Sequence, residues 1–299
     1  MRVAVTGAGG RLGRALVEAL AEAPFTGLSG PIAWTRSEFD LDEPGAIAGL
    51  LDRDRPEAVV NAAAWTDVDG CAREPDVARR RNEIAVRVLA EATAARGVDL
   101  VQVSTNEIFD GARTDGHGYT PDDVPNPINP YGESKLGGEL AAAEAYREPG
   151  AHLGIVRTAW LYGPPGNDFP SKILAAADRA RNVGEPLKVV ADETGSPTYA
   201  RDVADAIVDL LGSGDVFGIH HVVNSGVASR AGWARELFRQ ARLDVAIEEV
   251  PGSTWPRAST PPAWAVLEPT PLPSGEPLRP WQAALADYLP SLLRATAAR

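Results

Sequence analysis

A glycine-rich segment near the N-terminus most constrains what this chain can fold into. It follows the apolar run Val3–Thr6 and leads into residues 12–23, whose apolar side chains recur at helical spacing. Gly7, Gly10 and Gly13 give the spacing GxxGxxG. Between a strand and a helix, glycines allow a tight turn whose backbone N–H groups can approach a pyrophosphate, aided by the positive helix end. The segment therefore predicts a dinucleotide-binding turn at the start of an α/β fold.

Short apolar runs alternate with helical patterns through the first half of the chain. We expect further strands at residues 31–35, 58–61, 100–104 and 153–158, and helices at about 46–52, 77–96 and 131–146. Buried runs between helices are typical of a parallel sheet covered on both faces, and right-handed crossovers make such a sheet doubly wound. The predicted fold class is α/β, a doubly wound parallel (Rossmann) sheet with a smaller C-terminal substrate-binding lobe.

The second half of the chain has a less regular pattern. We expect helices at about 169–181, 203–211, 233–241 and from 281 onward, strands at about 187–190, 220–224 and 245–250, and a proline-rich loop over 251–280. The predicted domains are a dinucleotide-binding Rossmann domain over 1–163 and a mainly substrate-binding lobe over 164–299. Some segments of the lobe should return to the sheet domain.

Composition and charge exclude several kinds of partner. The net charge of -12 over 299 residues repels nucleic-acid phosphates and anionic lipid surfaces, so we expect neither partner. The single cysteine, Cys71, suits a reducing compartment. The sequence begins with a strand and has no apolar stretch of roughly 18 residues, so we expect a cytoplasmic protein. The four histidines lack metal-ligand spacing, so no metal site is expected.

Residues after the second strand bear on the choice of cofactor. Folds that select NAD usually carry an acidic residue there, which bonds the ribose 2′-hydroxyl. This chain has Arg36 instead, and Arg36 and Arg11 could pair with a 2′-phosphate or lie solvated on the surface. The pattern favours NADPH, with NADH as the alternative. The remaining expected cofactor contacts are Leu12 after the glycine turn, Asp40 and Leu41 at the adenine, and Asn61, Ala62 and Ala63 at the end of the third strand.

The segment NPYGESK carries the candidate catalytic pair. Tyr131 and Lys135 are four residues apart, so on a helix their side chains share one face. A nearby ammonium stabilises a phenolate and lowers its pKa, and the same lysine can hold the nicotinamide ribose. The chain has only three lysines among 29 basic residues, so a lysine here indicates a need for one. Thr105 or Ser104 can supply a hydroxyl that polarises a substrate carbonyl.

Seven segments together make the chain resemble the dTDP-4-dehydrorhamnose reductase family of extended short-chain dehydrogenases. They are TGAGGRLG, FDLDEP, NAAAWTDVDGCAREPDVARRRNEIAVRVLA, STNEIFDG, NPYGESKLGGE, RTAWLYGPPGNDF and ADETGSPTYARDVADAI. The resemblance implies NAD(P)H-dependent reduction of the C4 ketone of a nucleotide sugar, a triad of Thr105, Tyr131 and Lys135, and a substrate contact from Trp160. We expect Ser104 and Asn106 to contact the substrate as well. Several family members form dimers, so it suggests a homodimer.

One segment departs from the family pattern. The family usually has Asp-Tyr after Ser-Thr at the fourth strand end, where this chain has Asn106-Glu107. Related 4,6-dehydratases have Asp-Glu there, so Glu107 is dehydratase-like and Asn106 is not. Three alternatives stay open: a nucleotide-sugar epimerase or dehydratase, another deoxysugar ketoreductase, and a regulatory subunit similar to the β-subunit of methionine adenosyltransferase. NADPH oxidation with a 4-keto sugar nucleotide would separate these classes.

Overall fold

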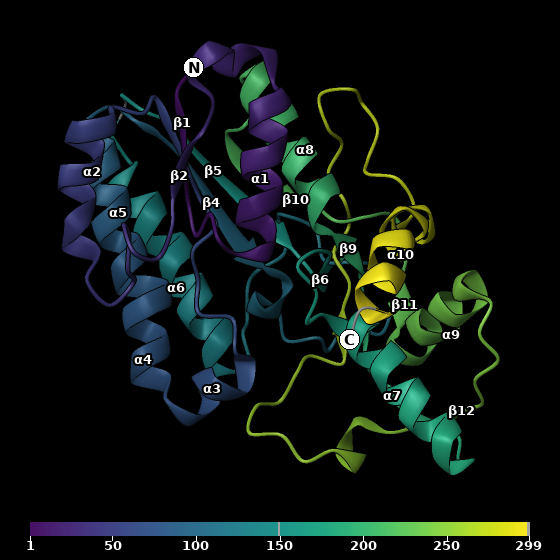
Figure 1. Cartoon of the computed structure of the whole chain (residues 1–299). Helices are drawn as coiled ribbons and strands as arrows, with labels where there is room; N and C mark the ends of the chain where they lie inside the picture. Colours follow the sequence, from purple (N-terminus) through teal and green to yellow (C-terminus); the bar gives the residue numbers. More distant parts are fainter. Residues whose placement is uncertain (149, 298–299) are drawn as a thin grey trace.

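A six-stranded parallel sheet forms the centre of the computed structural model, which describes residues 1–148 and 150–297 (Figure 1). The strands, in spatial order, are β10 (Gly218–His221), β5 (Leu153–Thr158), β4 (Asp99–Thr105), β3 (Ala58–Asn61), β1 (Val3–Thr6) and β2 (Ile32–Trp34). From β1 the chain first adds β2 at one side of β1. It then crosses to the other side of β1, where β3, β4, β5 and β10 follow in turn. Strand order therefore reverses between β1 and β3, where open α/β sheets bind ligands.

Helices cover both faces of this sheet, as expected for a doubly wound fold. One face carries α1 (Arg11–Glu22) and α8 (Ala200–Ser213), and the other carries α2 (Ile47–Asp54), α5 (Ala85–Ala94) and α6 (Pro130–Ala145). The four residues of β1 and the four of β3 are all buried. This burial explains why the first three residues of each strand are apolar. The predicted fold class is confirmed.

The second half of the chain builds a smaller lobe beside the carboxyl ends of the strands (Figure 1). Its elements are β6 (Leu161–Tyr162), α7 (Phe169–Val183), β7 (Leu187–Val190), β8 (Thr194–Gly195), β9 (Thr198–Tyr199), β11 (Ala228–Ser229), α9 (Arg230–Ala241), β12 (Ile247–Val250), β13 (Trp264–Ala265) and α10 (Trp281–Ala297). All of them except β8 and β13 contribute to a separate core around the buried Trp233, Leu237 and Tyr288. Meanwhile β10 and α8 return to the main sheet.

Several predicted elements differ from the structure. The helix expected over 77–96 is α4 (Pro75–Arg79), a π-helical turn (Arg80–Ile84) and α5, and a short helix α3 (Val68–Arg73) precedes it. The strand expected over 220–224 lies at Gly218–His221 instead, because the Asn224 side chain bonds Asp202 and the Tyr199 backbone and so leads the chain away. The loop expected over 251–280 contains β13 and a 3-10 turn (Gly252–Thr254). Further 3-10 turns lie at Pro24–Ser29, Pro44–Ala46 and Asn106–Ile108.

Candidate active site

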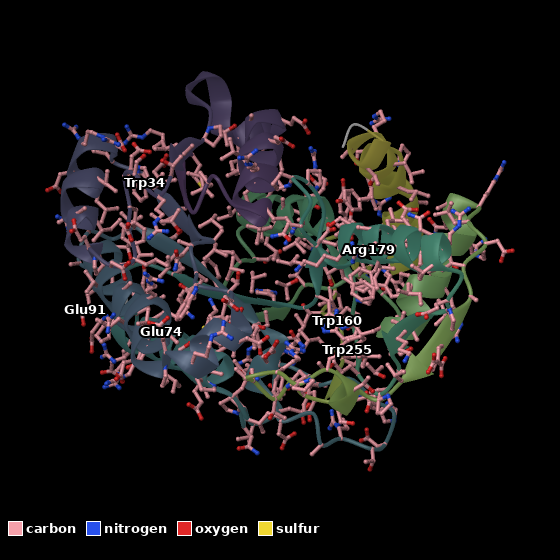
Figure 2. The ribbon with its side chains drawn as sticks, turned by 60° about the horizontal axis from the view of Figure 1, so that its bottom comes forward. Trp34, Glu74, Glu91, Trp160, Arg179 and Trp255 are labelled. Atoms are coloured by element: carbon pink, nitrogen blue, oxygen red, sulfur yellow. The ribbon has the colours of Figure 1, made fainter. Side chains whose placement is uncertain are left out.

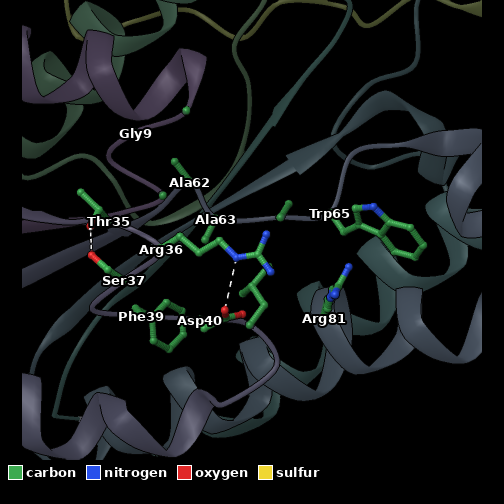
Figure 3. Close-up of a pocket in the computed structure, with 14 residues that line it drawn as sticks. Gly9, Thr35, Arg36, Ser37, Phe39, Asp40, Ala62, Ala63, Trp65 and Arg81 are labelled. Carbon is green, nitrogen blue, oxygen red and sulfur yellow. Dashed lines mark hydrogen bonds and ion pairs between the residues drawn. The ribbon is translucent and has the colours of Figure 1, made fainter.

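A cavity of about 510 Å³ opens where the strand order reverses. The loops that follow β1, β2 and β3 line it, as Figure 3 shows. Among its walls are Gly7, Gly10, Arg36, Asp40, Leu41, Ala62 and Ala63, all of which the sequence predicts as cofactor contacts. We refer to it as the dinucleotide cavity, because its position and shape fit an extended cofactor whose pyrophosphate lies on the glycine turn.

The glycines of the turn are required by close backbone packing. Gly7 has φ +63°, and a Cβ added there would lie 2.9 Å from the Ala63 backbone. A Cβ on Gly13 would lie 2.1 Å from the Gly7 carbonyl oxygen, so Gly13 lets α1 start against the turn. Gly9, in contrast, has open space where its Cβ would be, and it lines the cavity. The backbone can therefore approach a phosphate closely at this turn.

Arg36 lies at the rim of the dinucleotide cavity. Its side chain is 77% exposed, and its Nε donates to Asp40 Oδ2 at 3.2 Å (Figure 3). Asp42 lies 3.8 Å from the same guanidinium and accepts two hydrogen bonds from Arg81, at 2.8 and 2.7 Å. The Arg36 side chain also lowers the pKa of Asp40, after the larger effect of the Asp42 backbone N–H. Such an exposed guanidinium can turn toward an added phosphate.

Arg11 and Asn61 lie elsewhere than the other predicted cofactor contacts. Arg11 donates to the carbonyl oxygens of Gly163 and Gly166, at 3.1 and 2.7 Å, and lines the neighbouring cavity rather than the dinucleotide cavity. The structure therefore does not place Arg11 beside Arg36, where the two were expected to bind a 2′-phosphate together. Asn61 is 1% exposed and lines neither cavity, because its amide bridges Thr6 and Gln102 between adjacent strands.

A second cavity of about 420 Å³ adjoins the first and contains the predicted catalytic residues. We call it the catalytic cavity. The predicted residues that line it are Gly10, Arg11, Leu12, Ala62, Ser104, Thr105, Asn106, Tyr131, Lys135 and Trp160. The ends of β4 and β5 and the first turn of α6 therefore meet at one place, as expected for a ligand site outside the carboxyl ends of parallel strands.

Helix α6 is positioned by its own first residues. The Asn129 side chain accepts a hydrogen bond from the Gly132 N–H at 2.9 Å, and Pro130 occupies the first turn. A Cβ on Gly132 would lie 2.0 Å from the Glu107 carbonyl oxygen, so this glycine lets the helix approach the end of β4. Further along, the buried Glu139 carboxylate pairs with Arg157 of β5 at 2.8 Å. These contacts fix Tyr131 and Lys135 against β4.

Lys135 is almost fully buried at 4% exposure. Its ammonium donates to the Val103 carbonyl oxygen at 2.7 Å. Burial lowers the pKa of Lys135 to about 8, and the charge of Glu139 acts in the opposite direction. The ammonium is thus held at the base of the catalytic cavity in a position that a ligand hydroxyl can share.

Tyr131 has the opposite pKa shift from the one expected. Burial raises the pKa of the Tyr131 hydroxyl, the charge of Glu107 raises it further, and a hydrogen bond with Thr105 lowers it. The expected lowering by Lys135 is wrong for this structure, because desolvation of a phenolate outweighs it and the Lys135 ammonium is directed at Val103. Tyr131 is therefore protonated at neutral pH, the form that can donate a proton.

Hydroxyl and amide groups at the ends of β4 and β5 also line the catalytic cavity. Thr105 Oγ1 donates to Asn106 Oδ1 at 3.3 Å, and the Asn106 amide donates to the Ala265 carbonyl oxygen at 3.1 Å. Within residues 1–148 and 150–297, the buried hydroxyls of Ser104 and Thr158 have no hydrogen-bond partner, and both residues line the catalytic cavity. Buried polar groups are normally satisfied, so these hydroxyls indicate where a polar ligand binds.

Glu107 also lines the catalytic cavity. The Asn129 amide donates to its Oε2 at 2.8 Å. Burial raises the pKa of the Glu107 carboxyl, while the Asn129 hydrogen bond and then the charge of Arg230 act to lower it. A carboxyl in this setting can position a polar substrate group.

Trp160 and Arg230 form the wall toward the second lobe. The Arg230 guanidinium lies 3.5 Å from the Trp160 ring centroid, and Trp160 stacks on Trp233 at 5.9 Å. Gly195 leaves room for this ring, since a Cβ there would lie 2.6 Å from it, and Trp160 itself has φ +42°. Sequence reasoning missed Arg230, because the chain has 26 arginines and only folding brings this one to the site.

The described residues contain neither a metal-binding cluster nor a helix that could span a membrane. Over residues 1–148 and 150–297 no group of three or more His, Cys, Asp and Glu side chains is arranged to hold a metal ion. In the same part of the chain, every helix is too short or too polar to cross a membrane.

The fold and site define a dinucleotide-dependent enzyme of the extended short-chain type, and comparisons with known proteins give the family. The family described as RmlD substrate binding domain matches residues 1–294, and the chain belongs to it. The chain is 36% identical to a dTDP-4-dehydrorhamnose reductase of Mycolicibacterium smegmatis, over 99% of this chain and 87% of the relative. It is 35% identical to a dTDP-4-keto-6-deoxy-D-glucose reductase of Streptomyces niveus, over 96% of both chains.

A solved structure is similar over nearly the whole chain. The dTDP-4-dehydrorhamnose reductase of Bacillus anthracis, in complex with NADP, has a TM-score of 0.85 and 30% identity, covering 97% of this chain and 99% of that one.

Proposed function

We propose that this protein reduces the C4 ketone of dTDP-4-dehydro-L-rhamnose to dTDP-L-rhamnose with NADPH. The observation that carries the proposal is the catalytic cavity, where Tyr131, Lys135 and Thr105 meet beside the dinucleotide cavity. The family relationship supports the substrate, because relatives at 36% identity are named for this reaction.

The residues of this chain fit a nicotinamide dinucleotide. The glycine turn and α1 would hold the pyrophosphate, Arg36 the 2′-phosphate, and Asp40 and Leu41 the adenosine end. Lys135 would hold the nicotinamide ribose, where its ammonium already donates to a carbonyl oxygen of β4. When bound, NADPH supplies the hydride for the ketone carbon.

Three side chains would carry the rest of the reaction. The Thr105 hydroxyl, or that of Ser104, binds the ketone oxygen and polarises the carbonyl. The Tyr131 hydroxyl gives its proton to the same oxygen as negative charge develops there. Trp160 and Asn106 would line the sugar, with Trp160 held by its stacking on Trp233.

A substrate panel tests the proposed function. Purified protein is mixed with NADPH or NADH and with dTDP-4-dehydrorhamnose or dTDP-4-keto-6-deoxyglucose, and cofactor oxidation is followed with product analysis. We expect NADPH oxidation with the rhamnose precursor and formation of dTDP-L-rhamnose. Reduction of the glucose-derived ketone alone would assign the chain to the other named reductase. No oxidation with either sugar would refute the ketoreductase and favour a regulatory subunit.

Arg36 should set a preference for NADPH over NADH. Replacing it with Ala removes the cation and leaves Asp40 and Asp42 facing the 2′-phosphate. We therefore expect the ratio of kcat/KM with NADPH to kcat/KM with NADH to fall about tenfold. Steady-state rates with both cofactors measure it. Arg14→Ala, an exposed arginine of α1 that does not line the dinucleotide cavity, is the control. An unchanged ratio in Arg36→Ala would remove the role of Arg36.

The Asn106-Glu107 pair should not support dehydration. Elimination of water needs one group to take the C5 proton and another to protonate the leaving hydroxyl, and an amide does neither. Asn106 is moreover bonded to Thr105 and Ala265. We expect no 4-keto-6-deoxy product from dTDP-glucose with catalytic NAD, as judged by mass spectrometry. Accumulation of that product would show that the protein is a dehydratase, as Glu107 suggests, and would contradict the argument from Asn106.

Three further expectations remain predictions. They are the division at residue 163 into a cofactor-binding domain and a mainly substrate-binding lobe, a cytoplasmic location, and a homodimer. Light scattering on the purified protein measures the last of these.

A further inference from the structure

Helix α6 buries two of its four charged residues. Glu133 and Glu144 are exposed, whereas Lys135 and Glu139 are 4% and 3% exposed. A buried charge is costly unless it has a partner, so charged side chains rarely lie inside a protein without a reason. Ketone reduction as proposed uses Lys135 but gives no task to Glu139. The burial of this carboxylate therefore needs an explanation.

Glu139 and Lys135 lie on the face of α6 that packs against the sheet. They are four residues apart, a spacing that places two side chains next to each other, with Cβ atoms about 5–6 Å apart. The Lys135 ammonium donates to the Val103 carbonyl oxygen of β4 at 2.7 Å. The Glu139 carboxylate accepts three hydrogen bonds from Arg157 of β5, at 3.1, 3.2 and 2.8 Å. Arg157 is the register partner of Ser104, which directly follows Val103, so both charges of α6 are anchored on adjacent strands.

Arg157 is the cation that allows Glu139 to stay charged in the interior. It is 2% exposed itself, and its forked guanidinium satisfies the carboxylate through several hydrogen bonds. A negative charge is thereby held one helical turn from Lys135. Such a charge favours the protonated form of an amine, and it acts more strongly in a buried site than in water. In agreement, burial lowers the pKa of Lys135 to about 8, and Glu139 acts against this lowering.

The other ionisable groups on the elements packed against α6 have different partners or are exposed. The pairs are Glu107 with Asn129, Glu83 with Arg79, Asp99 with His152, Asp69 with Arg257 and Arg81 with Asp42. The rest are exposed, as Figure 2 shows for Glu91 of α5. Burial raises the pKa of Tyr131 and of Cys71, so both are neutral at neutral pH. His221, 3.5 Å from Arg157, is neutral too, because burial lowers its pKa to about 4. Among the described residues, no other group thus replaces the charge that Glu139 places beside Lys135.

We propose that Glu139 is a positioning residue of the reaction, whose carboxylate, held ionised by Arg157, keeps the Lys135 ammonium protonated at working pH. Without this carboxylate, a larger share of the molecules would carry a neutral amine at Lys135. A neutral amine forms weaker hydrogen bonds to a ribose hydroxyl than an ammonium does. The inference rests on the proposed function for the role of Lys135 and assigns the buried ion pair a task in it.

The pKa of Lys135 can be measured directly, because the chain has only three lysines. In protein that carries isotope-labelled lysine, NMR follows the Cε and Nζ signals of Lys135 across the neutral and alkaline range. The exposed Lys172 and Lys188 give the reference signals. Glu139→Gln removes the negative charge and keeps the shape of the side chain. We expect the pKa of Lys135 to fall by about one pH unit in this variant.

A second variant covers the case in which Glu139→Gln does not fold, since that change leaves the buried Arg157 unpaired. Glu139→Gln/Arg157→Met removes both charges and leaves neither without a partner. It should show a fall in the same direction, because the loss of a nearby cation can only raise the pKa of Lys135. Glu133→Gln is the matched control, because Glu133 is an exposed carboxylate of the same helix, and it should leave the pKa of Lys135 unchanged.

A purely structural ion pair would give a different result. Its removal would lower the melting temperature and leave the pKa of Lys135 where it is in the wild type. That outcome, or an equal fall of the pKa in Glu133→Gln, would overturn the inference. In the active enzyme, the alkaline fall of kcat/KM should begin about one pH unit lower in the Glu139 variants than in the wild type.

The NMR titration needs neither cofactor nor substrate, so it separates the inference from the proposed function. If the pKa of Lys135 falls in the Glu139 variants but the wild type reduces no 4-keto sugar, the proposed function fails and the effect of Glu139 on Lys135 stands. If the wild type reduces the sugar and the pKa is the same in every variant, the inference fails alone.

Discussion

Replacing Tyr131 with Phe should lower kcat by about 10²–10⁴-fold, the usual contribution of a positioned general acid. The hydroxyl is the one proton donor that we assign to the developing alkoxide. Because burial and Glu107 raise the pKa of Tyr131, the wild-type residue is protonated at neutral pH. Phenylalanine keeps the ring packed beside Cys71 and Ala78 and loses only the hydroxyl. Steady-state NADPH oxidation with the 4-keto sugar measures the effect.

Two controls separate lost chemistry from lost structure in this variant. The affinity for NADPH should be close to that of the wild type, and the melting temperature should change little. Tyr146→Phe is a matched control, since the Tyr146 hydroxyl bonds Thr93 and Val98 at the far end of the same helix. Near wild-type turnover in Tyr131→Phe would show that Tyr131 is not the proton donor, even though the chain belongs to the reductase family.

Regular elements with strong patterns were predictable from the sequence. The strands at 3–6, 58–61 and 153–158 match to the residue, because each is a short apolar run buried on both faces. The two-residue strands β6, β8, β9, β11 and β13 were not predicted. A pair of residues carries no periodicity, and these strands exist because tertiary packing brings their backbones together.

The candidate site was predictable where local sequence determines geometry. Asn129, Pro130 and Gly132 determine the start of α6 within a few residues of Tyr131. One short sequence motif therefore contains all the residues that position this helix. Contacts across long sequence separations gave no such signal. Arg230 joins Trp160 from 70 residues away, and the bonds of Arg11 to Gly163 and Gly166 depend on how the second lobe folds back.

The pKa of Tyr131 shows why residue types alone were insufficient. A Tyr-Lys pair on one helix face predicts a lowered phenolic pKa, but the net shift depends on burial and on where the ammonium points. Here the Lys135 ammonium donates to Val103, and desolvation dominates at Tyr131. Proton donation to a ketone needs the protonated phenol, which is present at neutral pH for an ordinary tyrosine as well as for one whose pKa is raised.

Lys135→Arg should lower kcat/KM about 10²-fold, although arginine is the usual cation of this chain. The site is 4% exposed and built for a compact ammonium that donates to Val103 at 2.7 Å. A planar guanidinium is larger and spreads its charge, so it would displace the cofactor ribose or the neighbouring strand.

The pH profile gives this substitution a second measurement. Burial lowers the pKa of Lys135 to about 8, so its positive charge is present below that pH and lost as the pH rises through it. If the reaction needs the ammonium, the wild-type rate falls above about pH 8. Arginine stays protonated, so Lys135→Arg should be slower at neutral pH and should lack that alkaline fall. Rates and pH profiles equal to those of the wild type would show that Lys135 takes no part in the reaction.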